Sequence, residues 1–387
     1  MHETVAPDHQ DIRQGVRRLC ARFEGSYWQA LDRERAYPTQ FVQALTEEGY
    51  LAILIPEAYG GAGLPLSAAA AVLEEIHRSG GNGAACHAQM YTMGTLLRHG
   101  SEDQKRLWLP QIASGALRLQ AFGVTEPGSG TDTSRITTFA RRDGDRYVVN
   151  GQKIWISRAE HSDLLLLLCR TAPREAGPRP TDGMSVLLVD LREAVGHGLT
   201  IRPIRTMLNH ATTELFFDDL EVPAANLIGE EGRGFSYILD GMNAERILIA
   251  SECLGDGRFF VDRSSAYAAE RQVFGRPIGQ NQGVQFPIAR AHVQIEAAAL
   301  MVARASSLFD DGQACGTEAN MAKLLASEAS WAAADVCLQT HGGFGFAEEY
   351  DIERKFREAR LYLTAPISTN LILSHVAVHV LGLPKSF

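Results

Sequence analysis

The chain has 387 residues, of which 45% are hydrophobic and 21% are charged, and its formal net charge is −9. Because this length exceeds what one simple core needs, we expect two or three packed units of an ordinary globular protein. The negative charge argues against a nucleic-acid partner, since a protein that binds phosphates needs a basic face.

The cysteines and the apolar stretches indicate a soluble protein of a reducing compartment. The six cysteines are far apart and form no C-x-x-C pair, so neither a disulfide framework nor a thiolate metal site is expected. The first ten residues, MHETVAPDHQ, show neither the basic nor the apolar part of a signal peptide. The longest apolar stretch, centred on residues 164–169, is too short to span a bilayer. We therefore expect a cytoplasmic protein without a membrane partner.

The first 120 residues are predicted to form an N-terminal helical domain. Ser101-Glu102-Asp103-Gln104 is a capping-box pattern, which predicts a helix that begins there and stops near Pro110. The segment IPEAYGGAG, residues 55–63, is predicted to be a loop because it is rich in Gly and contains Pro.

Residues 121–231 change to a strand pattern and are predicted to form a middle β domain. ITTFARRDGDRYVVNGQKIWIS contains β-branched and aromatic runs separated by Asp-Gly and Asn-Gly, and both dipeptides indicate hairpin turns. DLLLLLC, MSVLLVDL and TELFFDDLEV are predicted to be further strands. The intervening TAPREAGPRPTDG is predicted to be a loop.

Residues 232–387 return to a helical pattern, with long Ala-rich segments such as HVQIEAAALMVARASSLF and EANMAKLLASEASWAAADVCLQ. The expected class is therefore α+β and multidomain: helices, then a β unit, then a helical bundle.

Several common site motifs are missing. The sequence has no G-x-G-x-x-G, no P-loop, no H-E-x-x-H and no G-x-S-x-G. His375 and His379 have the i, i+4 spacing of a metal pair, but no third candidate ligand lies nearby, so a surface or packing role is the better interpretation and no metal is expected.

Two segments of the middle region have the features of a ligand site. GVTEPGSGTD, residues 123–132, is a loop of small and hydroxyl residues, which either binds an anionic or carbonyl-rich ligand or is only a tight turn. In NGQKIWIS, the period of two places Trp155 and Ser157 on the same side of one strand. An aromatic side chain beside a hydroxyl suits a flat heteroaromatic ring with a hydrogen-bonding edge.

Six segments together resemble the acyl-CoA dehydrogenase family over nearly the whole chain. GVTEPGSGTD is similar to the flavin loop of that family, and KIWIS to its K-x-W-I-T strand. QTHGGFGFAEEYDIERKFRE, residues 339–358, has the spacing of the C-terminal signature throughout. ERQVFGRPIGQNQGVQF, residues 270–286, resembles the segment that binds the FAD of a neighbouring subunit. IPEAYGGAG and VPAANLIGEEGRGF follow in the family's order.

The resemblance implies FAD as cofactor and assigns roles to individual residues. Thr125 and Ser157 would hydrogen-bond the isoalloxazine edge, Trp155 would pack on the ring, and Thr131 would lie at the pyrophosphate. Ser368 would close the flavin site from the C-terminal segment. The FAD of a partner subunit in a homodimer or homotetramer would be held by Arg271, Phe274, Gln282, Gln339, Gly342 and Gly343. The implied fold is an N-terminal all-α domain, a middle β-barrel-like domain and a C-terminal four-helix bundle.

The catalytic base departs from the commonest family pattern. Much of the family has a Glu in a Y-E-G-T segment, but here Pro366 occupies that position. In a subset that includes isovaleryl-CoA dehydrogenase, the Glu lies in an L-x-x-E-R segment instead, and Glu245 of Met242-Asn243-Ala244-Glu245-Arg246 matches it. Glu245 also shares the apolar helical stripe of Ile238 and Ile249, where desolvation favours a raised carboxyl pKa. The alternative is a buried Glu paired with an Arg for structure.

Further expectations concern Asn243, Arg246 and Pro366. Asn243 and Arg246 match family positions that contact the CoA portion or order the active site. In the family, the backbone N–H at the position of Pro366 polarises the thioester carbonyl, and proline has no N–H. Losing one such donor commonly costs about 3 kcal/mol. Either the loop shifts so that Ile367 donates, or the activation differs from the family pattern, or the enzyme is not an ordinary dehydrogenase.

The predicted function is therefore FAD-dependent α,β-dehydrogenation of an acyl-CoA to the trans-2-enoyl-CoA. Glu245 would take the α-proton, flavin N5 the β-hydride, and an electron-transfer flavoprotein the electrons. An enoyl-CoA reductase, a flavin monooxygenase and a catalytically silent FAD-binding protein remain as alternatives, and the presence of Glu245 speaks against the last two.

Overall fold

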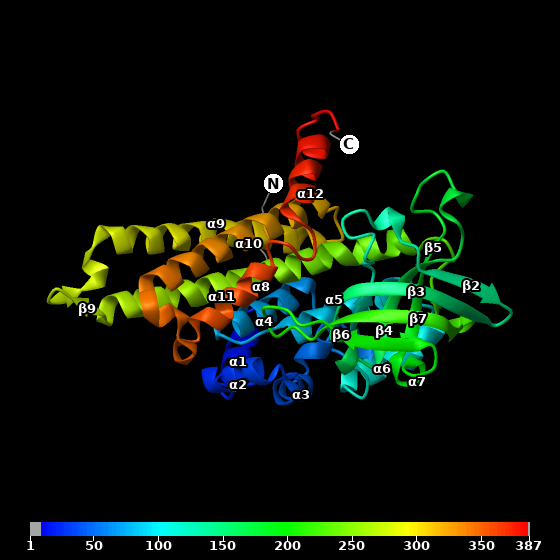
Figure 1. Ribbon diagram of the computed structural model, residues 1–387, viewed down its shortest axis with the longest axis horizontal. Coiled ribbons are helices and arrows are strands. Elements are labelled where there is room, and N and C mark those ends of the chain that lie inside the picture. Colours follow the sequence, from blue (N-terminus) through cyan, green and yellow to red (C-terminus); the bar gives the residue numbers. More distant parts are fainter. Residues whose placement is uncertain (1–8, 386–387) are drawn as a thin grey trace. The chain divides into compact units, whose positions relative to one another are not determined.

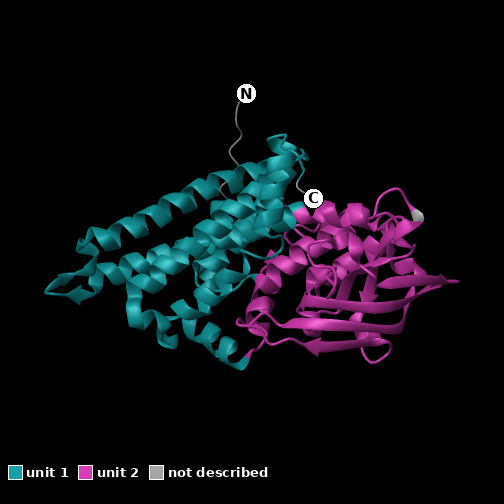
Figure 2. Ribbon diagram, turned by 45° about the horizontal axis from the view of Figure 1, so that its top comes forward, with its two compact units in different colours: residues 1–34, 65–83, 243–387 teal, residues 35–64, 84–242 magenta. Residues whose placement is uncertain are grey.

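The computed structural model describes residues 9–385, which belong to two compact units (Figure 2). Unit 1 contains the chain up to Glu34, residues 65–83 and the chain from Asn243 onward, and unit 2 contains residues 35–64 and 84–242. The expectation about a signal peptide rests on MHETVAPDHQ, most of which lies outside the described residues.

The bundle of unit 1 is formed by the long C-terminal helices (Figure 1). These are α8 (Gly234–Glu270, which enters unit 1 at Asn243), α9 (Gln282–Asp310), α10 (Gly316–His341) and α11 (Ile352–Leu361). Glycine lets the helices approach closely: a Cβ on Gly257 of α8 would lie 2.8 Å from Ile295 of α9. The helical pattern predicted after residue 232 is confirmed.

Shorter elements complete unit 1. A two-stranded hairpin, β9 (Gln272–Val273) and β10 (Arg276–Pro277), joins α8 to α9, and α12 (Thr369–His375) is followed by a π turn, Val376–Val380. The N-terminal helices of this unit are α1 (Gln10–Cys20), α2 (Gly25–Glu34) and α4 (Leu66–Arg78). Arg13 and Arg17 of α1 form ion pairs with Glu75 of α4 at 3.0 and 2.7 Å, which fixes α1 on α4.

The helices of unit 2 are α3 (Thr39–Glu47), α5 (Ala84–His99), α6 (Glu102–Ser114) and α7 (Leu191–Ala194). The predicted capping box opens α6, since the Ser101 side chain accepts from the Gln104 N–H. The predicted end at Pro110 is wrong, because α6 continues through this proline to Ser114. It stops only where Gly115 adopts φ 76°, a left-handed conformation that glycine accepts without strain.

An eight-stranded mixed sheet forms the remainder of unit 2 within the described part of the chain. Its order is β6-β7-β3-β2-β4-β5-β8, and β1 pairs with β4 in parallel. The strands are β1 (Leu119–Gly123), β2 (Phe139–Asp143), β3 (Arg146–Ser157), β4 (Leu164–Arg170), β5 (Met184–Asp190), β6 (Leu199–Pro203), β7 (Thr212–Pro223) and β8 (Leu227–Ile228). The strands predicted from DLLLLLC, MSVLLVDL and TELFFDDLEV are confirmed as β4, β5 and β7.

One of the two predicted hairpin turns is wrong. Asp143-Gly144 does turn, because Asp143 of β2 pairs with Arg146 of β3. Asn150-Gly151 instead lies inside β3, where the register with β7 shifts. There the Asn150 side chain bonds Asp219 of β7, donating to its carboxylate and accepting from its N–H. A Cβ on Gly151 would lie 2.6 Å from Thr138, so the glycine permits close strand contact and makes no turn.

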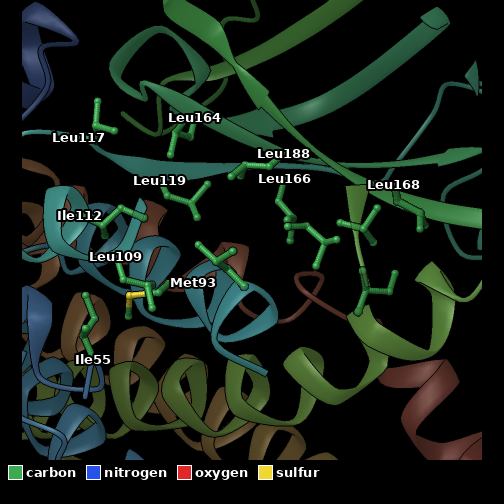
Figure 3. Close-up of a cluster of buried hydrophobic side chains, with 14 of the residues drawn as sticks. Ile55, Met93, Leu109, Ile112, Leu117, Leu119, Leu164, Leu166, Leu168 and Leu188 are labelled. Atoms are coloured by element: carbon green, nitrogen blue, oxygen red, sulfur yellow. The ribbon is translucent and has the colours of Figure 1, made fainter. Parts of the chain in front are cut away.

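Alternate residues of β4 and β5 face two separate cores. Leu164, Leu166 and Leu168 pack with residues of α5 and α6 such as Met93 and Ile112 (Figure 3). Leu165, Leu167 and Cys169 pack instead with strand residues such as Tyr147, Val149 and Phe217. Since both faces are buried, the leucine run of β4 reads as a continuous apolar strand.

Short 3-10 turns connect these elements: Tyr50–Ala52, Glu57–Tyr59, Thr133–Arg135, Ala159–His161, Arg174–Ala176, Ala224–Asn226, Ile278–Gln280, Gly342–Phe346 and Glu348–Tyr350. No helix within residues 9–385 has the length and apolarity to cross a bilayer. All six cysteines are buried thiols.

Candidate active site

The loop after β1 is held in place by a buried ion pair between Glu126 and Lys153. Glu126 accepts hydrogen bonds from the N–H groups of Thr137 (2.6 Å) and Thr138 (2.9 Å) and pairs with Lys153 Nζ at 2.8 Å. Lys153 of β3 also donates to the Val124 carbonyl at 2.9 Å. Thr125, between Val124 and Glu126, is therefore held on both sides, and its carbonyl accepts from the Ile154 N–H.

The ion pair perturbs both pKa values. Burial alone would raise the pKa of Glu126, but the Lys153 ammonium and the threonine donors outweigh it and lower the pKa to about 2. Burial lowers the pKa of Lys153, and Glu126 opposes that shift. At neutral pH the pair is charged, which makes the loop a rigid platform.

Trp155 is exposed at an irregularity in β3. The indole is 58% exposed, and the backbone has φ 63°, an uncommon conformation for a bulky residue. The register with β7 shifts between Lys153 and Ile156. Ile156 is buried, and Trp155 and Ser157 on either side of it are not. The exposed indole and the partly buried Ser157 remain the candidates for the flat surface and the polar edge that the sequence predicts.

The remaining predicted flavin residue of unit 2 is Thr131, which is exposed. The loop around it has open space: a Cβ on Gly128 or Gly130 would meet no atom within 4 Å. Backbone N–H groups in such a loop can approach a diphosphate closely. Unit 2 thus carries the predicted residues for the ring and for the pyrophosphate, and their chemistry fits FAD.

In unit 1, one turn of α8 carries the candidate base. Glu245 is 7% and Arg246 8% exposed. Arg246 Nη1 donates to Asn243 Oδ1 at 3.0 Å, while its Nε has no partner among the described residues. Burial lowers the pKa of Arg246, and Glu245 opposes that shift. The structure therefore brings Asn243 and Arg246 together and buries the guanidinium, which the sequence pattern did not reveal.

The segment that carries Pro366 lies between α11 and α12 of the same unit. The Ala365–Pro366 peptide bond is cis. The carbonyl of Ile367, the residue after Pro366, accepts from Lys323 Nζ of α10 at 2.9 Å. The Ser368 hydroxyl accepts from the Leu371 N–H at 3.4 Å and caps α12. Ser368 is thus fixed by a cap on one side and by the lysine-held peptide on the other.

The residues predicted to hold a partner's FAD lie in two regions of unit 1: the hairpin with the first residue of α9, and the end of α10 with the turn after it. Arg271 precedes β9, and its guanidinium lies 5.5 Å from the centre of the Phe344 ring, in the turn after α10. Phe274, between β9 and β10, is fully exposed with φ 51°. Gln282, Gln339, Gly342 and Gly343 are exposed as well. The cation–π contact brings Arg271 to the turn that contains Gly342 and Gly343.

Three buried charged residues that structure these sites were not predicted: Glu126, Lys153 and Lys323. The available signal was a charged residue inside an apolar run, as for Lys153 in KIWI and Lys323 in MAKLLA. Within residues 9–385, no group of three or more His, Cys, Asp or Glu side chains could hold a metal ion.

Comparison with known proteins identifies the family. The chain matches the acyl-CoA dehydrogenase N-terminal domain over residues 6–116, the middle domain over 121–220 and the C-terminal domain over 232–376. It is 34% identical over 384 residues to acyl-CoA dehydrogenase FadE12 of Mycobacterium tuberculosis, covering 98% of this chain and 97% of that protein.

Three solved structures are similar over the whole chain. A glutaryl-coenzyme A dehydrogenase in complex with glutaryl-CoA has a TM-score of 0.92 and 30% identity, covering 100% of this chain and 98% of that one. A chain from an electron-transferring flavoprotein study of Acidaminococcus fermentans has a TM-score of 0.91 and 29% identity. The match covers 98% of this chain and 100% of that one. A glutaryl-CoA dehydrogenase of Mycobacterium smegmatis in complex with FADH2 has a TM-score of 0.89 and 25% identity. The match covers 98% of this chain and 96% of that one. The chain belongs to the acyl-CoA dehydrogenase family and is an FAD-dependent oxidoreductase that dehydrogenates acyl-CoA thioesters.

Proposed function

We propose that Glu245 is the base that removes the α-proton of the acyl-CoA. The observation that carries this proposal is a carboxylate only 7% exposed on α8, in a chain whose other family base position is occupied by Pro366. A carboxylate in such surroundings is poorly hydrated. Arg246 beside it adds a positive charge, which favours the carboxylate before the proton transfer.

The structural alternative is a Glu that only neutralises the neighbouring Arg, and the titration of E245Q distinguishes the two roles. The guanidinium of Arg246 donates through Nη1 to Asn243, so it is oriented by a neutral partner. We assign Asn243 and Arg246 to ordering the active site on the substrate side, with Asn243 as the half-buried residue that can reach the CoA portion.

The flavin half is assigned to unit 2. Bound FAD supplies the acceptor for the β-hydride. Thr125 and Ser157 are proposed to bond the ring edge, Trp155 to pack on the ring and Thr131 to lie at the pyrophosphate. Ser368, in the C-terminal segment, is proposed to close the flavin site. Support comes from the rigid Glu126–Lys153 platform below Thr125 and from the exposed indole.

We further propose a homodimer or homotetramer in which each subunit holds part of its partner's FAD. The fully exposed Phe274 and the Arg271–Phe344 contact support this role for the hairpin and for the turn after α10. Gln282, Gln339, Gly342 and Gly343 are assigned to the same partner contact. We also propose domain boundaries near residues 120 and 231, close to the ends of the matched family ranges.

The substrate is proposed to be a short or branched acyl-CoA, because Glu245 matches the helix-borne base of isovaleryl-CoA dehydrogenase. An electron-transfer flavoprotein is the proposed electron acceptor. A reductase would use the same residues in the reverse direction, whereas a monooxygenase or a silent flavoprotein would not need the buried Glu245.

An anaerobic titration of the FAD-loaded protein with a panel of acyl-CoAs tests the base. We expect at least one thioester to bleach the flavin absorbance of the wild type and to leave Glu245→Gln oxidised. Glu296→Gln, an equal charge change on the exposed side of α9, is the matched control and should behave as the wild type. Equally fast reduction of E245Q would exclude Glu245 as the base.

A further inference from the structure

A buried lysine without a predicted role lies beneath the Pro366 segment. Lys323 of α10 is 0% exposed, and its ammonium donates to the Ile367 carbonyl at 2.9 Å. Among residues 9–385, no carboxylate forms an ion pair with this ammonium. The backbone carbonyl is thus the group that satisfies the charge.

Keeping an ammonium here is costly. Moving such a charge from water into a protein costs several kcal/mol unless it is well paired. Burial lowers the pKa of Lys323 to about 8, and Arg246 on α8 adds to this, while Cys253 of α8 and Glu328 of α10 oppose it. A methionine would fill the same space without that penalty, so packing does not account for the lysine.

The lysine fixes the direction of one peptide group. Because a trans peptide is planar with its C=O and N–H on opposite sides, a carbonyl of Ile367 that points to Lys323 turns the N–H of Ser368 away from it. Within the described residues, the N–H groups of Ile367 and Ser368 have no acceptor. With Pro366 unable to donate, these are the nearest backbone donors that remain for a ligand.

The same ammonium is electrostatically coupled to the helix turn of the proposed base. Arg246, next to Glu245, is one of the charges that act on Lys323. The two cations repel each other, which lowers the pKa of Lys323.

We propose that Lys323 is a positioning residue, whose ammonium holds the Ile367–Ser368 peptide so that the segment 364–368 can activate the acyl thioester. This inference rests on the proposed function. It assigns to a lysine of α10 the task of compensating for the donor that Pro366 lacks.

The test compares wild type with Lys323→Met, Lys323→Arg and the control Ser330→Ala, all as full-length FAD-loaded protein. Ser330 is also buried on α10 but has no hydrogen bond to the segment. Two quantities are measured: amide hydrogen exchange over residues 362–372, and the anaerobic rate of flavin reduction by the acyl-CoA that bleaches the wild type.

We expect K323M to exchange faster over 362–372, to retain its FAD, and to reduce about tenfold to a hundredfold more slowly, the effect of losing one charge-assisted hydrogen bond. K323R should restore most of the rate. S330A should match the wild type in both measurements.

The pH profile separates positioning from mere packing. The wild-type rate should fall as pH rises through about 8, where Lys323 loses its charge. In K323R this decrease should move to higher pH, since a guanidinium keeps its proton. A purely structural lysine would leave the wild-type profile level there.

Unchanged exchange in K323M, or a wild-type rate of reduction, overturns the inference. If K323M does not fold, K323Q against K323R decides it by the same measurements. If no acyl-CoA reduces the wild type, the proposed function fails, and the exchange data alone then decide whether Lys323 holds the segment.

Discussion

Breaking the Glu126–Lys153 pair should destabilise unit 2 and the flavin loop together. In Lys153→Met, the Glu126 carboxylate, 4% exposed, keeps its threonine donors but loses its counter-charge. Removing one partner of a buried pair commonly costs about 3–5 kcal/mol. The pKa of Glu126 is of matching size: a decrease from 4.5 to about 2, which includes the threonine donors as well as Lys153, corresponds to roughly 3 kcal/mol at about 1.4 kcal/mol per unit.

The assay is urea unfolding at pH 7, with FAD content measured in parallel. We expect K153M to lose about 3 kcal/mol in its free energy of unfolding and to retain FAD poorly, because Lys153 also holds the Val124 carbonyl beside Thr125. The double variant E126Q/K153M should lose less, since no charge is left uncompensated.

The lowered pKa of Glu126 also sets the direction in which the stabilisation by this pair changes with pH. Because the folded-state pKa of Glu126 lies below its unfolded value, this stabilisation is present above pH 4.5 and is lost as the pH falls toward 2. A loss below about 1 kcal/mol in K153M, or a larger loss in the double variant, would refute the reasoning.

Three further changes have defined outcomes. Gly151→Ala places a Cβ 2.6 Å from Thr138 at φ 144°. The free energy of unfolding should therefore decrease by roughly 1–3 kcal/mol, and the thermal midpoint should fall with it. Phe274→Ala removes a fully exposed ring, so the stability of the chain should not change while FAD retention falls. Burial alone would lower the pKa of His77, but Asp256 at 2.9 Å outweighs it, and the pKa rises to about 9. Since this value lies above the unfolded one, the stabilisation is present below pH 6.5 and should decrease as pH rises through 9, which pH-dependent unfolding of wild type and His77→Gln would show.

Each of these has a control or a contrary result. Gly283→Ala, with open space around its Cβ, should leave the thermal midpoint nearly unchanged. Equal FAD retention in F274A would remove the partner role of the hairpin. Parallel pH profiles of unfolding for wild type and H77Q would mean that His77 is neutral in the folded protein.

Local patterns in the sequence were sufficient for much of the fold. The capping box at Ser101 and the apolar runs of β4, β5 and β7 depend on neighbours a few residues away, and the structure has them as predicted. The family followed from motifs spread over the whole chain, and the comparisons confirm it. FAD and acyl-CoA chemistry came from the same motifs and not from the helical and strand patterns.

The tertiary structure decided what distant residues impose. Asn150-Gly151 has the sequence of a turn, but pairing with Asp219 and contact with Thr138 keep it inside a strand. Pro110 did not end α6, although the local rule predicted that it would. The partners of Glu126, Lys153 and Lys323 are 11 to 44 residues away along the chain, so no local pattern names them. A buried charge is stabilised by whichever groups the fold brings to it, and that depends on the packed chain as a whole.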